Sequence, residues 1–202
     1  MPGETISADA MVNWASEKMK GQNIVFVAEP HSEGIVHNVL KRVIGASAGK
    51  SNKLLLEAPD LFNDSVTRLS DLKAFWDSKH MSYMAELPRL TMKAGWVFHC
   101  VDGDCRAEGD VICGGKSVNR YGRERQIYIA KNILKWGLRT KGSCLVPYGA
   151  NHIKGGKNLP DFASLMSVSS YKKADRKYVM WGKEKKVAMA VSYADLKGSI
   201  NV

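Results

Sequence analysis

The stretch that decides the fold is Asn23-Ile24-Val25-Phe26-Val27-Ala28-Glu29-Pro30-His31. Residues 24–28 form a continuous apolar run of strand length that is rich in β-branched side chains. Such unbroken runs are typical of strands that are buried on both faces, as in parallel sheets. The run stops at Glu29, and His31 follows two residues later, so groups capable of acid–base chemistry stand at the predicted strand end.

Three further apolar runs end in polar residues in the same way. They occupy residues 54–56, 96–101 and 144–148, and they lead into Glu57, Asp102 and the sequence Gly149-Ala150-Asn151-His152. Because the carboxyl ends of parallel strands meet at one edge of a sheet, we expect these polar side chains to lie close together. Asp102 has a second interpretation as a turn residue, since Asp followed by Gly is a common turn signal.

Segments with the apolar spacing of amphipathic helices separate these runs, at residues 7–19, 35–44, 61–76, 84–93 and 122–137. The alternation predicts an α/β fold with a mostly parallel central sheet and helices on both of its faces. Near the C-terminus we predict a short helix at 159–165, a strand at 166–171, and an antiparallel hairpin formed by 177–181 and 187–193. Residues 102–117 are predicted to be loop, and residues 1–202 a single domain.

The composition excludes several classes of protein. The chain has 202 residues, and its 45% hydrophobic content is too high for an intrinsically disordered protein. Its apolar runs are too short for a membrane-spanning helix. The start Met1-Pro2-Gly3-Glu4 lacks the basic and apolar segments of a secretory signal. We therefore expect a cytoplasmic protein, or an effector that is exported without a cleaved signal peptide.

The net charge of +10 is unevenly distributed. Residues 1–115 carry 12 basic and 15 acidic side chains, whereas residues 116–202 carry 18 basic and 5 acidic ones. A basic C-terminal part of this kind is typical of a surface that approaches an anionic partner, such as nucleic acid, anionic lipid or an acidic protein. The alternative interpretation is that these lysines and arginines only solvate turns and the edge of the predicted hairpin.

The four cysteines, Cys100, Cys105, Cys113 and Cys144, are expected to be reduced thiols. Cys100 and Cys105 have the loose spacing of half a zinc site, but no second close pair completes it. We therefore do not expect a structural zinc site.

The histidines and carboxylates at the predicted strand ends allow two kinds of chemistry. Together they form the usual ligand set of a catalytic divalent metal, with a position left open for water. The same groups also perform metal-free acid–base catalysis, in which a histidine takes a proton and a carboxylate orients it. Both mechanisms use the same side-chain atoms, so the sequence leaves both open.

Four short motifs, in this order, resemble a known superfamily. They are Ala28-Glu29-Pro30-His31, the strand ending at Glu57, the helical Arg123-Glu124-Arg125-Gln126, and Gly149-Ala150-Asn151-His152. The order is similar to that of the superfamily that joins erythromycin esterases, ChaN-like haem-binding proteins, TraB proteins and Tiki proteases. Ala28 stands where those families usually have glycine. The resemblance covers roughly residues 24–152.

The resemblance implies a hydrolase of ester or amide bonds whose site consists of Glu29, His31, Glu57, Arg125 and His152. It also implies a possible divalent metal, such as Zn or Mn, held by Glu29, His31, Glu57 and His152. The substrate would be a small molecule or a peptide, and the chain bacterial. Two alternatives stay open: a non-catalytic toxin or effector module that binds an acidic partner through its basic C-terminal part, and a haem- or iron-binding protein.

Four of the candidate site residues also have purely structural interpretations. His31 could cap the following helix, and His152 could donate to a backbone carbonyl in its loop. Glu57 could stabilise the N-terminus of a helix through the helix dipole. Arg125 could be an exposed helix residue that pairs with a nearby carboxylate.

Overall fold

The computed structural model describes residues 4–21, 24–29, 35–48, 51–63, 69–79, 81–105, 109–138, 142–149, 152, 175–181 and 186–193. It contains a seven-stranded sheet with the order β1-β8-β9-β2-β7-β3-β4. Four neighbouring strands run parallel to one another: β2 (Ile24–Glu29), β7 (Cys144–Gly149), β3 (Lys53–Pro59) and β4 (Val97–Asp102), with β4 at the edge of the sheet. The predicted α/β fold with a mostly parallel sheet is confirmed.

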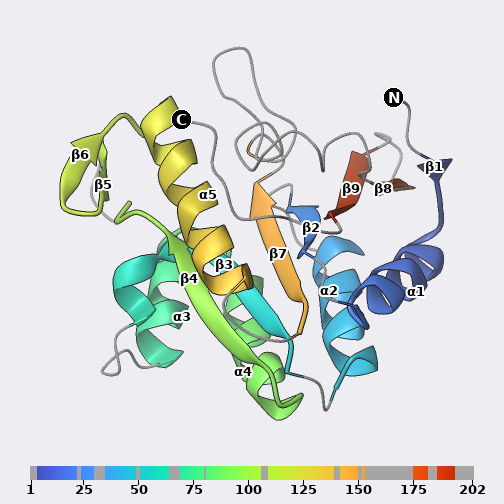
Figure 1. The fold of residues 1–202 in the computed structure, drawn as a ribbon. Helices are drawn as coiled ribbons and strands as arrows, with labels where there is room; N and C mark the ends of the chain where they lie inside the picture. The colour runs from blue at the N-terminus through green and yellow to red at the C-terminus, as the bar shows by residue number, and fades with distance from the viewer. Residues whose placement is uncertain are drawn as a thin grey trace.

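The other three strands of the sheet come from the two ends of the described chain. Strands β8 (Asp175–Trp181) and β9 (Lys186–Tyr193) form an antiparallel hairpin, which confirms the predicted C-terminal hairpin. Strand β9 lies antiparallel to β2, and the short β1 (Glu4–Thr5) lies parallel to β8. The first and last described segments therefore lie side by side, as Figure 1 shows.

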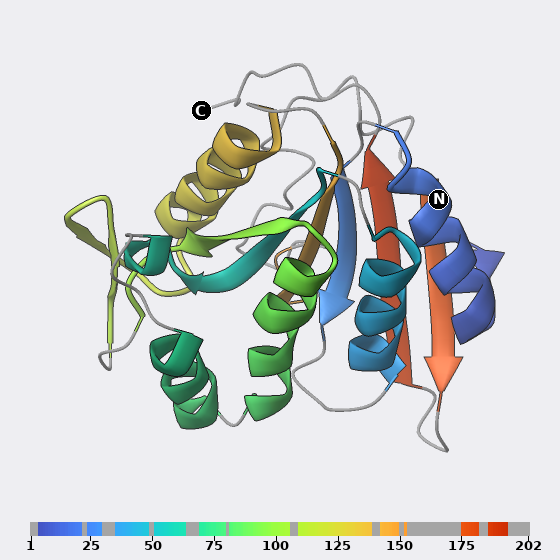
Figure 2. The same ribbon diagram turned by 90° about the horizontal axis from the view of Figure 1, so that it is seen from below.

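Helices cover both faces of the sheet (Figures 1 and 2). One face carries α1 (Ala8–Lys18), α2 (Ile35–Ala46), α3 (Leu69–Ser78) and α4 (Glu86–Lys93), and the other carries α5 (Arg123–Leu138). The strand residues divide between two hydrophobic clusters by alternation: Val25 and Val27 face α1 and α2, whereas Phe26 and Ala28 face α5. This alternation explains why the sequence shows unbroken apolar runs.

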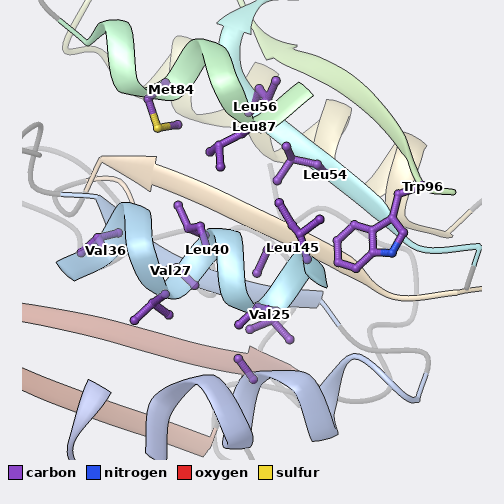
Figure 3. Close-up of a cluster of buried hydrophobic side chains, with 14 of the residues drawn as sticks. Val25, Val27, Val36, Leu40, Leu54, Leu56, Met84, Leu87, Trp96 and Leu145 are labelled. Carbon is purple, nitrogen blue, oxygen red and sulfur yellow. The ribbon is translucent and has the colours of Figure 1, made fainter. Parts of the chain in front are cut away.

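The larger cluster is close-packed across strands, helices and loops (Figure 3). Leu40 of α2 and Leu87 of α4 are fully buried against Leu54 of β3 and Leu145 of β7. Trp96, directly before β4, closes one end of the cluster, and its indole Nε1 donates to the carbonyl oxygen of Ser47 over 3.1 Å.

Most of the predicted elements are confirmed within a few residues, and three predictions need correction. Strand β3 continues past Glu57 to Pro59. The predicted helix 61–76 is a 3₁₀ turn, η1 (Asp60–Asn63), followed by α3. Residues 102–117, predicted to be loop, contain the hairpin of β5 (Val111–Cys113) and β6 (Lys116–Val118). The turn of this hairpin lies at Gly114 and Gly115, both with positive φ. Glycines occur in loops as well as in hairpin turns, so the sequence favours a loop here.

Other differences are small. A second 3₁₀ turn, η2 (Ser82–Ala85), precedes α4. Ser7 caps α1 by accepting a hydrogen bond from the backbone N–H of Ala10.

The helix predicted at 159–165 and the strand predicted at 166–171 lie outside the described residues. No described helix combines the length and the apolar character needed to cross a membrane.

The connections after β3 and β4 leave the sheet on opposite sides. From β3 the chain passes through η1 to α3, and from β4 it passes through the β5–β6 hairpin to α5. In open α/β sheets, ligands bind in the crevice at the point where neighbouring strands send their connections to opposite faces. The fold therefore points to the carboxyl ends of β3 and β4.

Candidate functional site

A cavity of about 360 Å³ lies at this point of the fold. Its lining comes from the carboxyl ends of β3 and β4, from α3 and the residues after it, and from the first turn of α5: Glu57, Phe75, Trp76, Lys79, Met81, Asp102, Cys105 and Arg125. The lining thus combines charged groups of β3, β4 and α5 with Lys79 and with apolar side chains from α3 and the residues after it.

The charged side is built on a buried ion pair between α5 and β4. Arg125 donates from Nε to Asp102 Oδ1 over 3.0 Å and from Nη2 to Asp102 Oδ2 over 2.5 Å. The side chain of Asp102 is fully buried, and its Oδ1 also accepts from the backbone N–H of Gly103. Burial lowers the pKa of Arg125, but the adjacent Asp102 outweighs it, so the pKa is raised overall and Arg125 remains a cation.

Arg125 has donors to spare after this pairing. Its Nη1 donates to the carbonyl oxygen of Arg120, and Nη2 lies 3.9 Å from Oε1 of Glu57. A guanidinium group carries five N–H donors, of which one each on Nε, Nη1 and Nη2 is engaged. One N–H therefore remains on each Nη nitrogen, on a side chain that lines the cavity.

Glu57 connects the ion pair to the neighbouring strand. Strands β3 and β7 are paired at only two positions, Lys53 with Cys144 and Leu54 with Leu145. Toward their carboxyl ends, Glu57 Oε2 accepts from the backbone N–H of Gly149 over 2.7 Å. The carboxylate of Glu57 thus takes the place that a strand carbonyl would otherwise occupy, and its other oxygen, Oε1, faces Arg125.

His152, three residues beyond β7, lies on the other side of Glu57. Its Nε2 is 4.0 Å from Glu57 Oε1, and its ring packs edge-on against Tyr148 with 5.0 Å between the ring centroids. Gln126, the residue after Arg125, contacts His152 twice. The amide Nε2 of Gln126 donates to the carbonyl oxygen of His152 over 2.8 Å, and its Oε1 lies 2.5 Å from His152 Nδ1.

These two contacts define the tautomer of His152. Since the amide nitrogen of Gln126 faces a carbonyl, its Oε1 must accept the hydrogen bond from the ring. Nδ1 of His152 is therefore assigned the proton, and Nε2 keeps the lone pair. The basic nitrogen is the one that faces Glu57.

Tyr148 and Cys105 stay protonated at neutral pH. Complete burial, followed by the nearby Asp102, raises the pKa of Tyr148 well above its usual value. Burial, followed again by Asp102, raises the pKa of the Cys105 thiol to about 11. The cavity therefore presents no thiolate nucleophile from Cys105. All four cysteines are unpaired, as the sequence predicts.

Three of the five predicted site residues come together at this site: Glu57, Arg125 and His152. Glu29 is the last residue of β2, and its backbone is paired with that of Gly149 in β7, the strand that lies between β2 and β3. The side chain of Glu29 lies outside the described part of the chain. His31 lies outside the described residues altogether.

Two of the structural interpretations fit the geometry poorly. Glu57 lies inside β3 and not at a helix N-terminus, because η1 begins three residues later. Arg125 is only 6% exposed, so it is not a surface helix residue, although it does pair with a carboxylate.

The predicted metal ligands are only partly described. Within the described residues no group of three or more His, Cys, Asp or Glu side chains is arranged to hold a metal ion. Of the four predicted ligands, the described side chains are those of Glu57 and His152, and the cationic Arg125 lies 3.9 Å from the Glu57 oxygen that would bind. These two side chains alone do not form a metal site.

Sequence reasoning missed two residues of this site. Asp102 stands at a strand end beside the other candidates, but the following glycine favoured a turn; the structure contains both the local hydrogen bond to Gly103 and the ion pair with Arg125. Gln126 looked like an ordinary helix residue. Its position next to Arg125 at the start of a helix was the only available signal.

Comparison of the chain with protein-family models, with curated proteins and with solved structures gave no match.

Proposed function

We propose that the chain is a hydrolase of ester or amide bonds, of the erythromycin esterase, ChaN, TraB and Tiki type that its motifs resemble. The observation that carries the proposal is the position of Glu57, which lies between the buried cation of Arg125 and the basic nitrogen of His152 at the edge of a cavity. A base, a carboxylate beside it and a cation are the groups that acyl transfer to water needs.

His152 acts as the general base. Its Nδ1–H is held by Gln126, so Nε2 is the ring nitrogen that takes a proton from water. The hydroxide attacks the carbonyl carbon of the substrate, and the tetrahedral intermediate expels the alcohol or amine. The leaving group takes the proton back from His152. Glu57, 4.0 Å away, stabilises the imidazolium that exists between these two proton transfers.

Arg125 stabilises the oxyanion. Asp102 holds the guanidinium in place through two hydrogen bonds, and the unused Nη N–H groups provide donors for the negative oxygen of the intermediate. Donors that are fixed before the reaction need no reorganisation when charge develops, and in a partly buried site this effect is worth several kcal/mol.

We assign Glu29, at the end of β2, and His31 to the same site, as the resemblance implies. In a metal-free site His31 is a second base, oriented by Glu29. In a metal site these two residues join Glu57 and His152 as ligands, and the ion would supply activation of water. Metal analysis of the purified protein by plasma mass spectrometry distinguishes the two, since a stoichiometric ion is expected only in the second case.

The test is hydrolysis of a panel of 4-nitrophenyl esters and 4-nitroanilides by the native chain and by two variants, His152→Gln and Glu57→Gln. Removing the base or its carboxylate partner should lower kcat by about 10²–10⁴-fold, the usual contribution of general base catalysis. The free energy of unfolding should fall by about 1–3 kcal/mol in His152→Gln, since the ring is only 12% exposed and contacts Gln126, so activities are compared under conditions where both proteins are folded. His31→Ala should show the same pattern.

Matched controls are His37→Gln and Glu86→Gln. His37 and Glu86 form a partly exposed pair between α2 and α4, away from the cavity, so both variants should keep full activity. The proposal fails if the native chain hydrolyses none of the compounds, or if His152→Gln and Glu57→Gln lose no more activity than these controls.

A further inference from the structure

The apolar part of the cavity lining comes from α3 and the residues after it. Phe75 and Trp76 of α3 are buried, and their tilted rings have centroids 4.6 Å apart. Met81, which lies after α3, also lines the cavity. At about 360 Å³ the cavity is at the small end of the range for small-molecule sites. It fits a short alkyl chain or a single aromatic ring better than a long polymer.

Lys79 adds a positive charge to this apolar part of the lining. Its Nζ donates to the carbonyl oxygen of Cys105 over 3.1 Å and lies 5.9 Å from the centre of the Phe75 ring. Within the part of the chain that the structure describes, no carboxylate lies within ion-pair distance of Lys79. Lys73, within α3, is by contrast paired with Asp77 over 2.5 Å.

The charges of the lining limit what can bind. Asp102 is neutralised by its two hydrogen bonds to Arg125, so the remaining fixed charges are the carboxylate of Glu57 and the ammonium group of Lys79. An ammonium group that contacts only a neutral carbonyl and a ring retains most of its capacity to pair with an anion. A singly charged anion matches Lys79, whereas a dianion would meet net repulsion from Glu57.

We propose that the cavity selects acyl substrates that carry one carboxylate at the far end of a short apolar group. The carboxylate pairs with Lys79, the apolar group packs on Phe75, Trp76 and Met81, and the ester or amide carbonyl lies at Glu57 and Arg125. The inference rests on the proposed hydrolase function for the position of the reacting bond. The selection of the anion rests on Lys79 alone.

The test compares two esters with acyl chains of equal length, mono(4-nitrophenyl) glutarate and 4-nitrophenyl valerate, which differ by the terminal carboxylate. In the native chain kcat/KM should be about tenfold higher for the glutarate ester, the effect of one charge-assisted hydrogen bond in a half-buried site. Lys79→Met and Lys79→Gln should abolish this ratio, because kcat/KM for the glutarate ester should fall to the value of the valerate ester in the same variant. The ratio is measured within each variant, so a partly unfolded population cancels.

The control is Lys73→Met, which removes an exposed, paired lysine from α3 and should leave the ratio unchanged. A second measurement is independent of turnover: calorimetric titration with 4-phenylbutyrate and with its neutral amide, where binding of the carboxylate should be favoured in the native chain and not in Lys79→Met. If this preference appears and no ester is hydrolysed, the hydrolase function is wrong and the anion site stands. Equal rates for the two esters, unchanged by Lys79→Met, overturn the anion site and leave the hydrolase function intact.

Discussion

The two ends of the parallel strands β3 and β7 are joined by different groups. At the amino ends the hydrogen bonds join backbone and amide groups: Asn52 Oδ1 accepts from the N–H of Ser143, and the carbonyl of Ser143 accepts from the N–H of Lys53, whose side chain is also buried there. At the carboxyl ends the partners are charged side chains that bind one another, and they border a cavity.

The difference follows from where the strands are paired. Strands β3 and β7 are hydrogen-bonded only at their amino ends, where Gly142, just before β7, lies in close contact with the backbone of Ser51, just before β3. At the other end the carboxylate of Glu57 replaces the strand pairing, at the cost of burying charge. One end therefore joins the strands through backbone hydrogen bonds, and at the other end a charged side chain that lines the cavity bridges them. Variants at each end test this division.

The largest effect is expected at the carboxyl end, from Arg125→Ala. The substitution leaves the fully buried Asp102 without its cation, and losing one partner of a buried ion pair costs about 3–5 kcal/mol of unfolding free energy. Urea denaturation followed by circular dichroism measures the loss. Replacing both partners in Asp102→Leu/Arg125→Met should recover most of the stability, because no buried charge is then left unpaired.

The control for this variant is Arg42→Ala. Arg42 pairs with Asp9 over 2.6 Å between α2 and α1, but both side chains are exposed, so the loss should stay below about 1 kcal/mol. If Arg125→Ala is no more destabilising than Arg42→Ala, the charged end of the sheet contributes little to the fold, and the comparison between the two ends fails.

The fold could be predicted from the sequence because the information is local. An unbroken apolar run such as 24–28 fits a strand buried on both faces, and the alternation of such runs with helical segments leaves few other arrangements. The β5–β6 hairpin was missed because its strands are three residues long, with an exposed residue in the middle of β5, and lack a period to detect. The order of the strands was not predictable, since it depends on packing between distant segments.

The site was partly predictable for a related reason. Glu57 and His152 stand at strand ends, where a general rule places ligand-binding residues. Arg125 came only from the resemblance to a family. For Asp102 the following glycine favours a turn residue, and the same carboxylate can both accept from Gly103 and form an ion pair. Only the three-dimensional structure shows that this carboxylate pairs with Arg125 of α5. Gln126 carries little signal beyond its place next to Arg125, because its role depends on the position of His152.

A smaller effect is expected at the amino end, from Gly142→Ala. Gly142 has φ of +105°, and an added Cβ would lie 1.9 Å from the carbonyl oxygen of Ser51. Backbone strain and steric overlap together should cost about 2–4 kcal/mol of unfolding free energy. The matched control is Gly109→Ala, which has a similar φ of +94° but open space around the added atom, so its cost should be about 1 kcal/mol. Equal losses in the two variants would show that the close contact at Gly142 does not matter.

The smallest effect is a pH dependence that also belongs to the amino end. The ring of His99 stacks on Trp136 with 3.7 Å between the ring centroids, and burial, followed by the charges of Lys53 and Lys135, lowers the pKa of His99 from 6.5 to about 4. Between these two values the unfolded chain binds a proton that the folded chain does not, so stability is complete above pH 6.5 and is lost as the pH falls toward 4. The ring is only half-buried, so solvent screening should limit the loss to about 1–2 kcal/mol. His99→Phe keeps the stacking and removes the titration, so the difference in unfolding free energy between pH 7 and pH 5 should shrink by that amount; an unchanged difference would place the acid sensitivity elsewhere in the chain.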